Sequence, residues 1–147
     1  MIKILNYETK INASKQKVWS VLWSEDTYPV WAAVFAEGSM ATSSWEEGSS
    51  ILFTDGNNSG MYSTIEKKMM NTQMTFKHIG MLKDGVKLPL DADSEQWSGS
   101  MEDYQLEEHN GITDLKVQLI STEVFASYLE DKFTDALQKI KELSEQS

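Results

Sequence analysis

The chain has 147 residues, a formal net charge of −10 and no cysteine. A chain of this length forms about one domain, so residues 1–147 are interpreted as a single domain. Without cysteine it has no disulfide framework, thiol nucleophile, iron–sulfur cluster or Cys-based zinc site. All 13 basic residues are lysine, against 23 acidic ones, and this balance argues against nucleic acid and membranes as partners.

The sequence shows neither a secretory signal nor a membrane helix. The first ten residues lack the central apolar stretch of a signal. The longest unbroken apolar run is 30–36, much shorter than the ~20 residues that span a membrane. A cytoplasmic protein is therefore expected.

The first part of the chain predicts one strand followed by two short helices. Isoleucines at β-like spacing indicate a strand over 2–11. The run Asn-Ala-Ser at 12–14 is typical of a helix cap, and the apolar residues of 18–23 follow with helical spacing. A second helix is predicted over 24–38, with Pro29 near its start and one face formed by Trp31, Val34 and Phe35.

The middle of the chain predicts strands joined by turns. Residues 51–54 alternate in polarity, and the run 55–60 is rich in turn formers, so a new strand is predicted from Met61. A further strand is indicated around 74–78, where one face carries Met74, Phe76 and His78.

The last part of the chain predicts a hairpin and a long helix. Strands over 101–108 and 115–119 flank Asn110-Gly111, a tight-turn pair. Apolar residues recur every three or four positions over 125–143, and Thr122 or Ser121 is a candidate cap before them. Together these features predict a helix of about 22–24 residues. The polar stretch 80–97 is too long for a simple hairpin loop and is a candidate gate or lid.

This order of elements predicts an α+β fold. Grouped strands with helices at both ends favour a curved antiparallel sheet of about six to seven strands. A long helix with one apolar face must lie along an apolar surface, and the sheet is the only candidate. We therefore expect two short helices and a long C-terminal helix packed across the concave face.

Short motifs occur in a characteristic order along nearly the whole chain. They are Ile11-Asn12-Ala13-Ser14, Val18-Trp19, Trp31, Phe35, Trp45-Glu46-Glu47-Gly48, Gly60-Met61, His78-Ile79-Gly80, Trp97-Ser98-Gly99, Glu102-Asp103-Tyr104, Gly111-Ile112-Thr113 and the helix 125–143. Together they resemble the START-like superfamily, also called SRPBCC or Bet v 1-like, which has the helix-grip fold. Within it, the chain is most similar to single-domain relatives of the C-terminal domain of the Hsp90 ATPase activator.

The resemblance implies a cavity between the sheet and the long helix. Members of the superfamily include lipid carriers, hormone receptors and polyketide cyclases, so the resemblance implies a fold more firmly than a function. The candidate ligand-binding residues are Trp31, Phe35, Phe53, Met61, Met74, Phe76, His78, Trp97, Glu102, Tyr104, Phe125, Leu129 and Phe133. The sequence leaves open whether these side chains enclose an open cavity or fill it, and whether Trp97 gates the cavity or anchors the polar stretch.

His78, Glu102 and Tyr104 are the polar candidates inside this apolar set. Glu102 and Tyr104 share the strand face that carries Leu106, which indicates that they point inward. Three roles remain open for the cluster: a structural hydrogen-bond network, a group that orients a polar ligand, or an acid–base pair. Since no inward position is a lysine and the chain has no arginine, a neutral, apolar guest is expected.

Metal and cofactor sites are not predicted. Two histidines cannot form a three-histidine metal site. The run 55–66 nearly has the spacing of a calcium loop, but strands rather than helices are predicted on both sides, so 55–60 is interpreted as a hairpin turn. The acidic run 91–95 lacks the glycine of such a loop and is interpreted as a solvated loop.

The sequence favours a non-enzymatic module that binds a small apolar ligand without a cofactor. No Gly-x-Ser-x-Gly elbow is present to supply a nucleophile, and no catalytic residue is assigned. Two alternatives remain. One is a protein-interaction module, such as a co-regulator of the chaperone Hsp90, and the other is a cyclase- or hydrolase-type enzyme that uses the same cavity.

Overall fold

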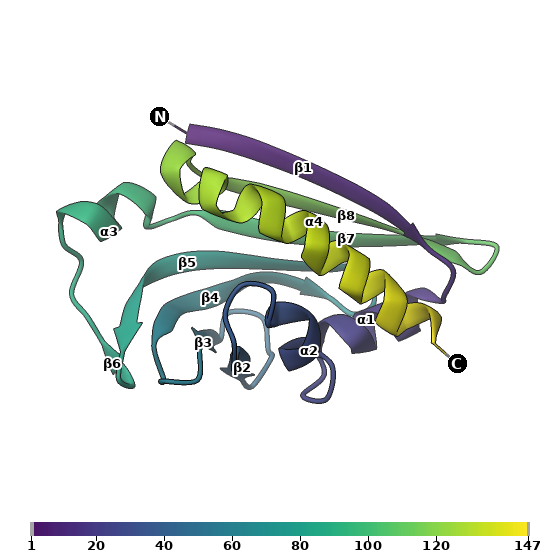
Figure 1. Cartoon of the computed structure of the whole chain (residues 1–147), viewed down its shortest axis with the longest axis horizontal. Coiled ribbons are helices and arrows are strands. Elements are labelled where there is room, and N and C mark those ends of the chain that lie inside the picture. Colours follow the sequence, from purple (N-terminus) through teal and green to yellow (C-terminus); the bar gives the residue numbers. More distant parts are fainter. Residues whose placement is uncertain (1, 147) are drawn as a thin grey trace.

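A computed structural model describes residues 2–146 (Figure 1). The strands are β1 (Ile2–Ile11), β2 (Met40–Ser43), β3 (Ser50–Thr54), β4 (Gly60–Met69), β5 (Gln73–Lys83), β6 (Val86–Lys87), β7 (Met101–His109) and β8 (Ile112–Thr122). The helices are α1 (Lys15–Trp23), α2 (Tyr28–Ala32), α3 (Ala92–Trp97) and α4 (Glu123–Glu145). The strands form one sheet in the order β1-β8-β7-β5-β4-β3-β2, with β6 paired to β5, and every pair is antiparallel.

The predicted α+β helix-grip fold is confirmed, but the number of strands is higher than expected. The sheet has eight strands within residues 2–146 rather than six to seven. The difference comes from short strands: β2 has four residues and β6 has two. Such segments are too short to show the polar–apolar alternation by which a strand is recognised in a sequence.

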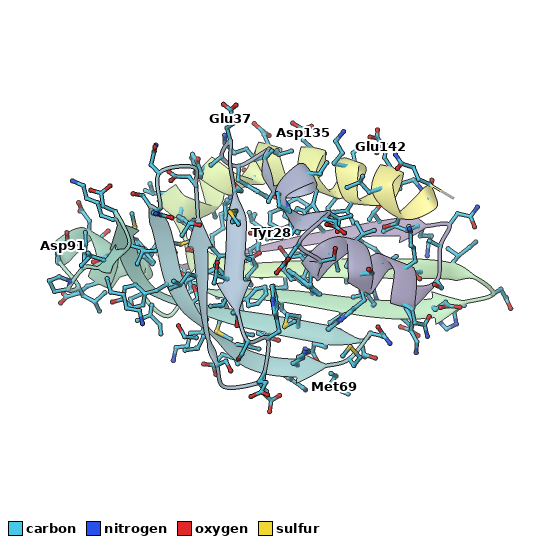
Figure 2. All side chains as sticks on the ribbon, turned by 90° about the horizontal axis from the view of Figure 1, so that it is seen from below. Tyr28, Glu37, Met69, Asp91, Asp135 and Glu142 are labelled. Atoms are coloured by element: carbon cyan, nitrogen blue, oxygen red, sulfur yellow. The ribbon has the colours of Figure 1, made fainter. Side chains whose placement is uncertain are left out.

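The long helix α4 crosses the sheet diagonally on one face (Figure 1). Its first turn is capped as predicted, because the Thr122 side chain accepts a hydrogen bond from the backbone N–H of Phe125 at 3.3 Å. Its apolar stripe faces inward through the buried side chains of Ala126, Phe133, Ala136, Leu137 and Ile140. Asp135 and Glu142 point away from the sheet (Figure 2), so the opposite face of α4 is acidic.

The second helix is shorter than predicted. It ends at Ala32 rather than near Gly38, and turns continue through Phe35. The Trp31 indole N–H donates a shared hydrogen bond to the backbone carbonyl oxygens of Val21 and Leu22. Both oxygens lie 3.2 Å from Nε1, and this contact joins α2 to the end of α1. After Ala32 the chain turns and reaches β2 at Met40. The predicted helical face of Trp31, Val34 and Phe35 is therefore wrong beyond Trp31.

Both predicted hairpin turns are confirmed. Asn110 and Gly111 both have positive φ angles, 54° and 81°, between β7 and β8, as a tight two-residue turn requires. The run 55–60 joins β3 to β4. There the Asp55 side chain accepts backbone N–H groups from Asn57 at 2.7 Å and Ser59 at 3.1 Å, so its carboxylate holds the turn.

The polar stretch 80–97 contains more regular structure than expected. Its first residues extend β5 to Lys83, β6 follows, and residues 92–97 form the helix α3. Asp91 accepts the backbone N–H of Ser94 at 2.8 Å, and the Ser94 side chain accepts the backbone N–H of Asp91 at 2.8 Å. The acidic run interpreted as a loop is therefore a capping box followed by one short helix.

Candidate functional site

A cavity of about 440 Å³ lies between the sheet, α2 and α4. This volume falls within the roughly 300–1,000 Å³ of typical small-molecule sites. Most of the residues nominated from the sequence line it, namely Trp31, Phe35, Phe53, Met61, His78, Trp97, Glu102, Tyr104, Phe125, Leu129 and Phe133. The structure therefore contains an open cavity rather than a fully packed core, which the sequence left undecided.

Two nominated residues lie outside the cavity lining. Met74 and Phe76 are 1% and 0% exposed and belong to the core. Phe76 is covered by the rings of Phe53, with a centroid distance of 5.1 Å, and Trp23, at 5.2 Å. Their strand face was predicted correctly, but strand parity gives the direction of a side chain and not which other side chains cover it.

Several lining residues were missed in the sequence, and Trp23, Tyr28 and Tyr128 are the most substantial of them. A signal for Tyr28 was present, because it precedes Trp31 by three residues and Ala32 by four, so all three share a helix face. Tyr128 likewise follows Phe125 by three residues. Figure 2 shows Tyr28 in the middle of the molecule, between the helices and the sheet.

A hydrogen-bonded chain of four side chains runs through one wall of the cavity. Ser63 Oγ lies 2.7 Å from His78 Nδ1, and His78 Nε2 lies 3.0 Å from Glu102 Oε1. The Tyr104 hydroxyl donates to the other carboxylate oxygen of Glu102. The predicted cluster of His78, Glu102 and Tyr104 is therefore assembled, and Ser63 is an additional member.

The order of the four hydrogen-bonded side chains determines which of their atoms a ligand can reach. Glu102 lines the cavity and its side chain is 18% exposed, whereas Ser63 is 1% exposed and does not line it. The arrangement is thus opposite to a serine hydrolase site, where the serine faces the substrate and the carboxylate lies behind the histidine. Glu102 is the carboxylate of the chain that a ligand can contact.

The hydrogen bonds also assign the protonation of His78. Within residues 2–146, His78 Nδ1 is the one hydrogen-bond partner of Ser63 Oγ. If Nδ1 accepts a hydrogen bond from the Ser63 hydroxyl and Nε2–H donates one to Glu102, both nitrogen atoms of His78 and the Ser63 hydroxyl have a partner. A protonated imidazole would leave the Ser63 hydroxyl proton without an acceptor in a buried position. We therefore assign a neutral His78 whose Nε2–H donates to Glu102.

Two phenols at the cavity are held in the neutral form. Burial raises the pKa of Tyr104 well above its ordinary value, and the negative charge of Glu102 raises it further. Burial, followed by the charge of Glu102, also raises the pKa of Tyr28. Tyr28 and Tyr104 are thus hydroxyl groups, not phenolates, throughout the ordinary pH range.

Alkaline titration of the native protein is expected to leave these two phenols un-ionised. A group whose pKa is raised on folding stabilises the folded state fully below its unfolded pKa, which is 10.0 for tyrosine. That stabilisation is lost as the pH rises above this value, so ionisation of Tyr28 and Tyr104 should coincide with unfolding. Tyrosinate absorbance and circular dichroism, followed together from pH 9 upward, check this. In the Tyr28→Phe variant, one fewer phenol should ionise with the unfolding step.

One part of the cavity lining brings together aromatic residues from distant segments. Trp97, at the end of α3, stacks on Phe125 of α4 with ring centroids 6.2 Å apart and planes 16° apart. Both line the cavity together with the exposed side chains of Met81 and Tyr128. This stacked pair therefore joins the end of the polar stretch to the first turn of α4.

Negative charge dominates the polar part of the lining. Among residues 2–146, no lysine lines the cavity, and its carboxylates are Glu102 and Asp55. Asp55 is already engaged with the backbone of its own turn. In the same part of the chain, no group of three His, Asp or Glu side chains is arranged to hold a metal ion, and none of the helices is long and apolar enough to cross a membrane.

Solved structures with the same architecture are numerous. The solution structure of the Aha1 dimer from Colwellia psychrerythraea is 20% identical, with a TM-score of 0.73 over 97% of this chain and 96% of that chain. The chain has the START-like helix-grip fold. CalU16 from Micromonospora echinospora is 14% identical, with a TM-score of 0.70 over 98% of this chain and 77% of that one.

A third START-like structure, Ara h 8.0201, is 10% identical, with a TM-score of 0.65 over 98% of both chains. No family model and no curated protein matches the sequence. At these identities the likeness concerns the START-like fold, so function has to be argued from the cavity itself.

Proposed function

We propose that this START-like protein is a non-enzymatic binding module for a small, largely apolar molecule held between the sheet and α4. The observation that carries the proposal is the cavity of about 440 Å³ with walls of aromatic and aliphatic side chains. Apolar walls with a few polar groups are the usual composition of ligand sites, because burial supplies the affinity and the polar groups set the orientation.

The cavity walls are built to stay open without a ligand. Phe133 packs against Tyr7, with centroids 5.3 Å apart, and against Phe35, at 5.4 Å. Tyr28 packs edge-on against Trp31 at 5.0 Å. Rings that are held by other rings cannot easily turn inward to fill the space, so this part of the lining is preorganised.

Binding of a neutral apolar dye tests the proposal directly. The purified protein should bind N-phenyl-1-naphthylamine with one site per chain and an increase in dye fluorescence. Leu129→Trp, which adds volume to the cavity wall, should weaken dye binding by about ten-fold or more. Val124→Trp places the same residue on α4 at a side chain that is 84% exposed, and it should bind the dye as the wild type does.

Two outcomes would contradict the proposal. One is a wild-type protein that does not bind the dye, and the other is equal weakening by Leu129→Trp and Val124→Trp. Native mass spectrometry after gentle purification gives independent support if a small molecule remains bound in the wild type and is absent from Leu129→Trp.

An acid–base enzyme is the second candidate, because Glu102, His78 and Tyr104 all line the cavity. A general base needs a carboxylate that is free to take a proton. Glu102 instead accepts hydrogen bonds from both His78 and Tyr104, one on each carboxylate oxygen, and these bonds hold the carboxylate in place. The cluster is thus better suited to holding a ligand than to reacting with it.

The protein-interaction alternative predicts an exposed apolar patch separate from the cavity. Exposed large hydrophobic side chains are distributed over several strands, α2, α4 and the connecting segments. Two of them, Met81 and Tyr128, belong to the cavity lining. Exposure of the Met81 and Tyr128 side chains is therefore accounted for by the ligand cavity.

A further inference from the structure

We propose that the ligand of this cavity is an apolar molecule carrying one protonated amine, and that the ammonium group binds Glu102. This inference rests on the proposed binding function and specifies its ligand class. It follows from the charge of the cavity wall, the unused acceptors at Glu102 and the aromatic groups around them.

Glu102 has acceptor capacity left on its cavity side. A carboxylate offers about four lone-pair positions, and the two protein donors, Tyr104 and His78, each occupy one. Glu102 is also among the residues that line the cavity. An ammonium group has three N–H donors and no acceptor, so it complements this surface.

Within residues 2–146, the cavity lining holds no fixed counter-charge for Glu102. His78 is assigned as neutral from its hydrogen bond to Ser63, and among residues 2–146 no lysine lines the cavity. An anionic ligand would bring a second negative charge beside Glu102 without compensation. A neutral ligand would satisfy one acceptor, but only a cation also supplies the opposite charge.

The surroundings of Glu102 also favour a cation. Tyr28, Trp23 and Tyr104 all line the cavity, and the faces of aromatic rings attract cations. Because Tyr28 lines the same cavity as Glu102, its hydroxyl oxygen is a further acceptor in the cavity wall. The charge of −10 on the chain further attracts cations from solution.

A series of three probes with one apolar body tests the inference. Isothermal titration calorimetry at pH 7 and low salt compares 2-naphthylmethylamine, 2-naphthalenemethanol and 2-naphthoate on the full chain. The protonated amine should bind about ten-fold more tightly than the alcohol, and the alcohol should bind more tightly than the carboxylate. Added salt should weaken the amine more than the alcohol.

Two variants test whether the preference for the amine over the alcohol comes from Glu102. Glu102→Gln removes the negative charge and should bring the affinity for the amine to within about three-fold of the affinity for the alcohol, measured on the same variant. Glu107→Gln makes the same change on β7 at a side chain that is 66% exposed, and it should keep the wild-type order. Circular dichroism of both variants establishes that they are folded.

The outcomes separate the two proposals. If the wild type binds alcohol and amine equally, or binds the carboxylate most tightly, the amine inference is overturned while the apolar binding function stands. If none of the three probes binds and the neutral dye also fails, the binding function itself is wrong. The three probes are compared on the wild-type protein, so they test the amine inference even if Glu102→Gln does not fold.

Discussion

Replacing Phe76 by alanine is expected to lower the free energy of unfolding by about 3–5 kcal/mol. Phe76 is 0% exposed, and its ring packs against Trp23 at 5.2 Å, Phe53 at 5.1 Å and Tyr104 at 6.2 Å. Removing it leaves a hole behind the cavity wall. Trp23 and Tyr104 also pack edge-on against each other at 4.9 Å, which limits how far either ring can move to close it. Urea unfolding, followed by tryptophan fluorescence, measures the loss.

Two controls show whether the loss comes from the buried ring. Phe76→Leu keeps much of the volume and should lose roughly 1 kcal/mol. Val124→Ala changes a side chain that is 84% exposed and should alter stability by about 0.5 kcal/mol or less. A loss below about 1 kcal/mol for Phe76→Ala would place the ring outside the core and contradict the described packing.

The parts of the fold that could be predicted are those with a long, regular pattern. The apolar stripe of α4 repeats over 125–143, and each repeat adds to the same conclusion. The β7–β8 hairpin combines alternation in both strands with the Asn110-Gly111 turn, so two independent signals agree. Inward parity of Glu102 and Tyr104 followed from Leu106, which is buried in the structure.

The features that could not be predicted from the sequence depend on contacts between elements that are distant in the chain. Ser63 shows no pattern of its own, and it joins the polar chain only because β4 pairs with β5 so that Ser63 lies opposite His78. An irregularity in this pairing, between Tyr62 and Ser63, shifts the register at that point. The extent of α2 likewise depends on its contact with α1 and not on local propensity. The open cavity is a result of packing, which composition and periodicity do not determine.

Replacing Gly60 by alanine is expected to destabilise the protein by roughly 3 kcal/mol. A Cβ atom at this position would lie 1.9 Å from the carbonyl oxygen of Phe53 and 3.0 Å from its carbonyl carbon. These are backbone atoms of the paired strand β3, so relief requires the β3–β4 pairing to open where Gly60 faces Thr54. Thermal and urea unfolding both measure the loss.

Gly80 of β5 is a second strand glycine and provides a matched comparison. It separates the effect of a clash with backbone atoms from the general effect of replacing a strand glycine by alanine. At Gly80 the added Cβ would meet the ring and hydroxyl of Tyr62, with a nearest distance of 2.5 Å. The Tyr62 side chain can turn aside, but it then loses its 3.2 Å hydrogen bond to the carbonyl oxygen of Leu88. Gly80→Ala should therefore lower the free energy of unfolding by only about 1 kcal/mol.

Since Gly60 also lines the cavity, the Gly60→Ala variant should bind the neutral dye more weakly, whereas Gly80→Ala should bind it nearly as the wild type does. Equal losses of stability in the two variants would show that the close approach of β4 to the Phe53 carbonyl is not what requires glycine at position 60.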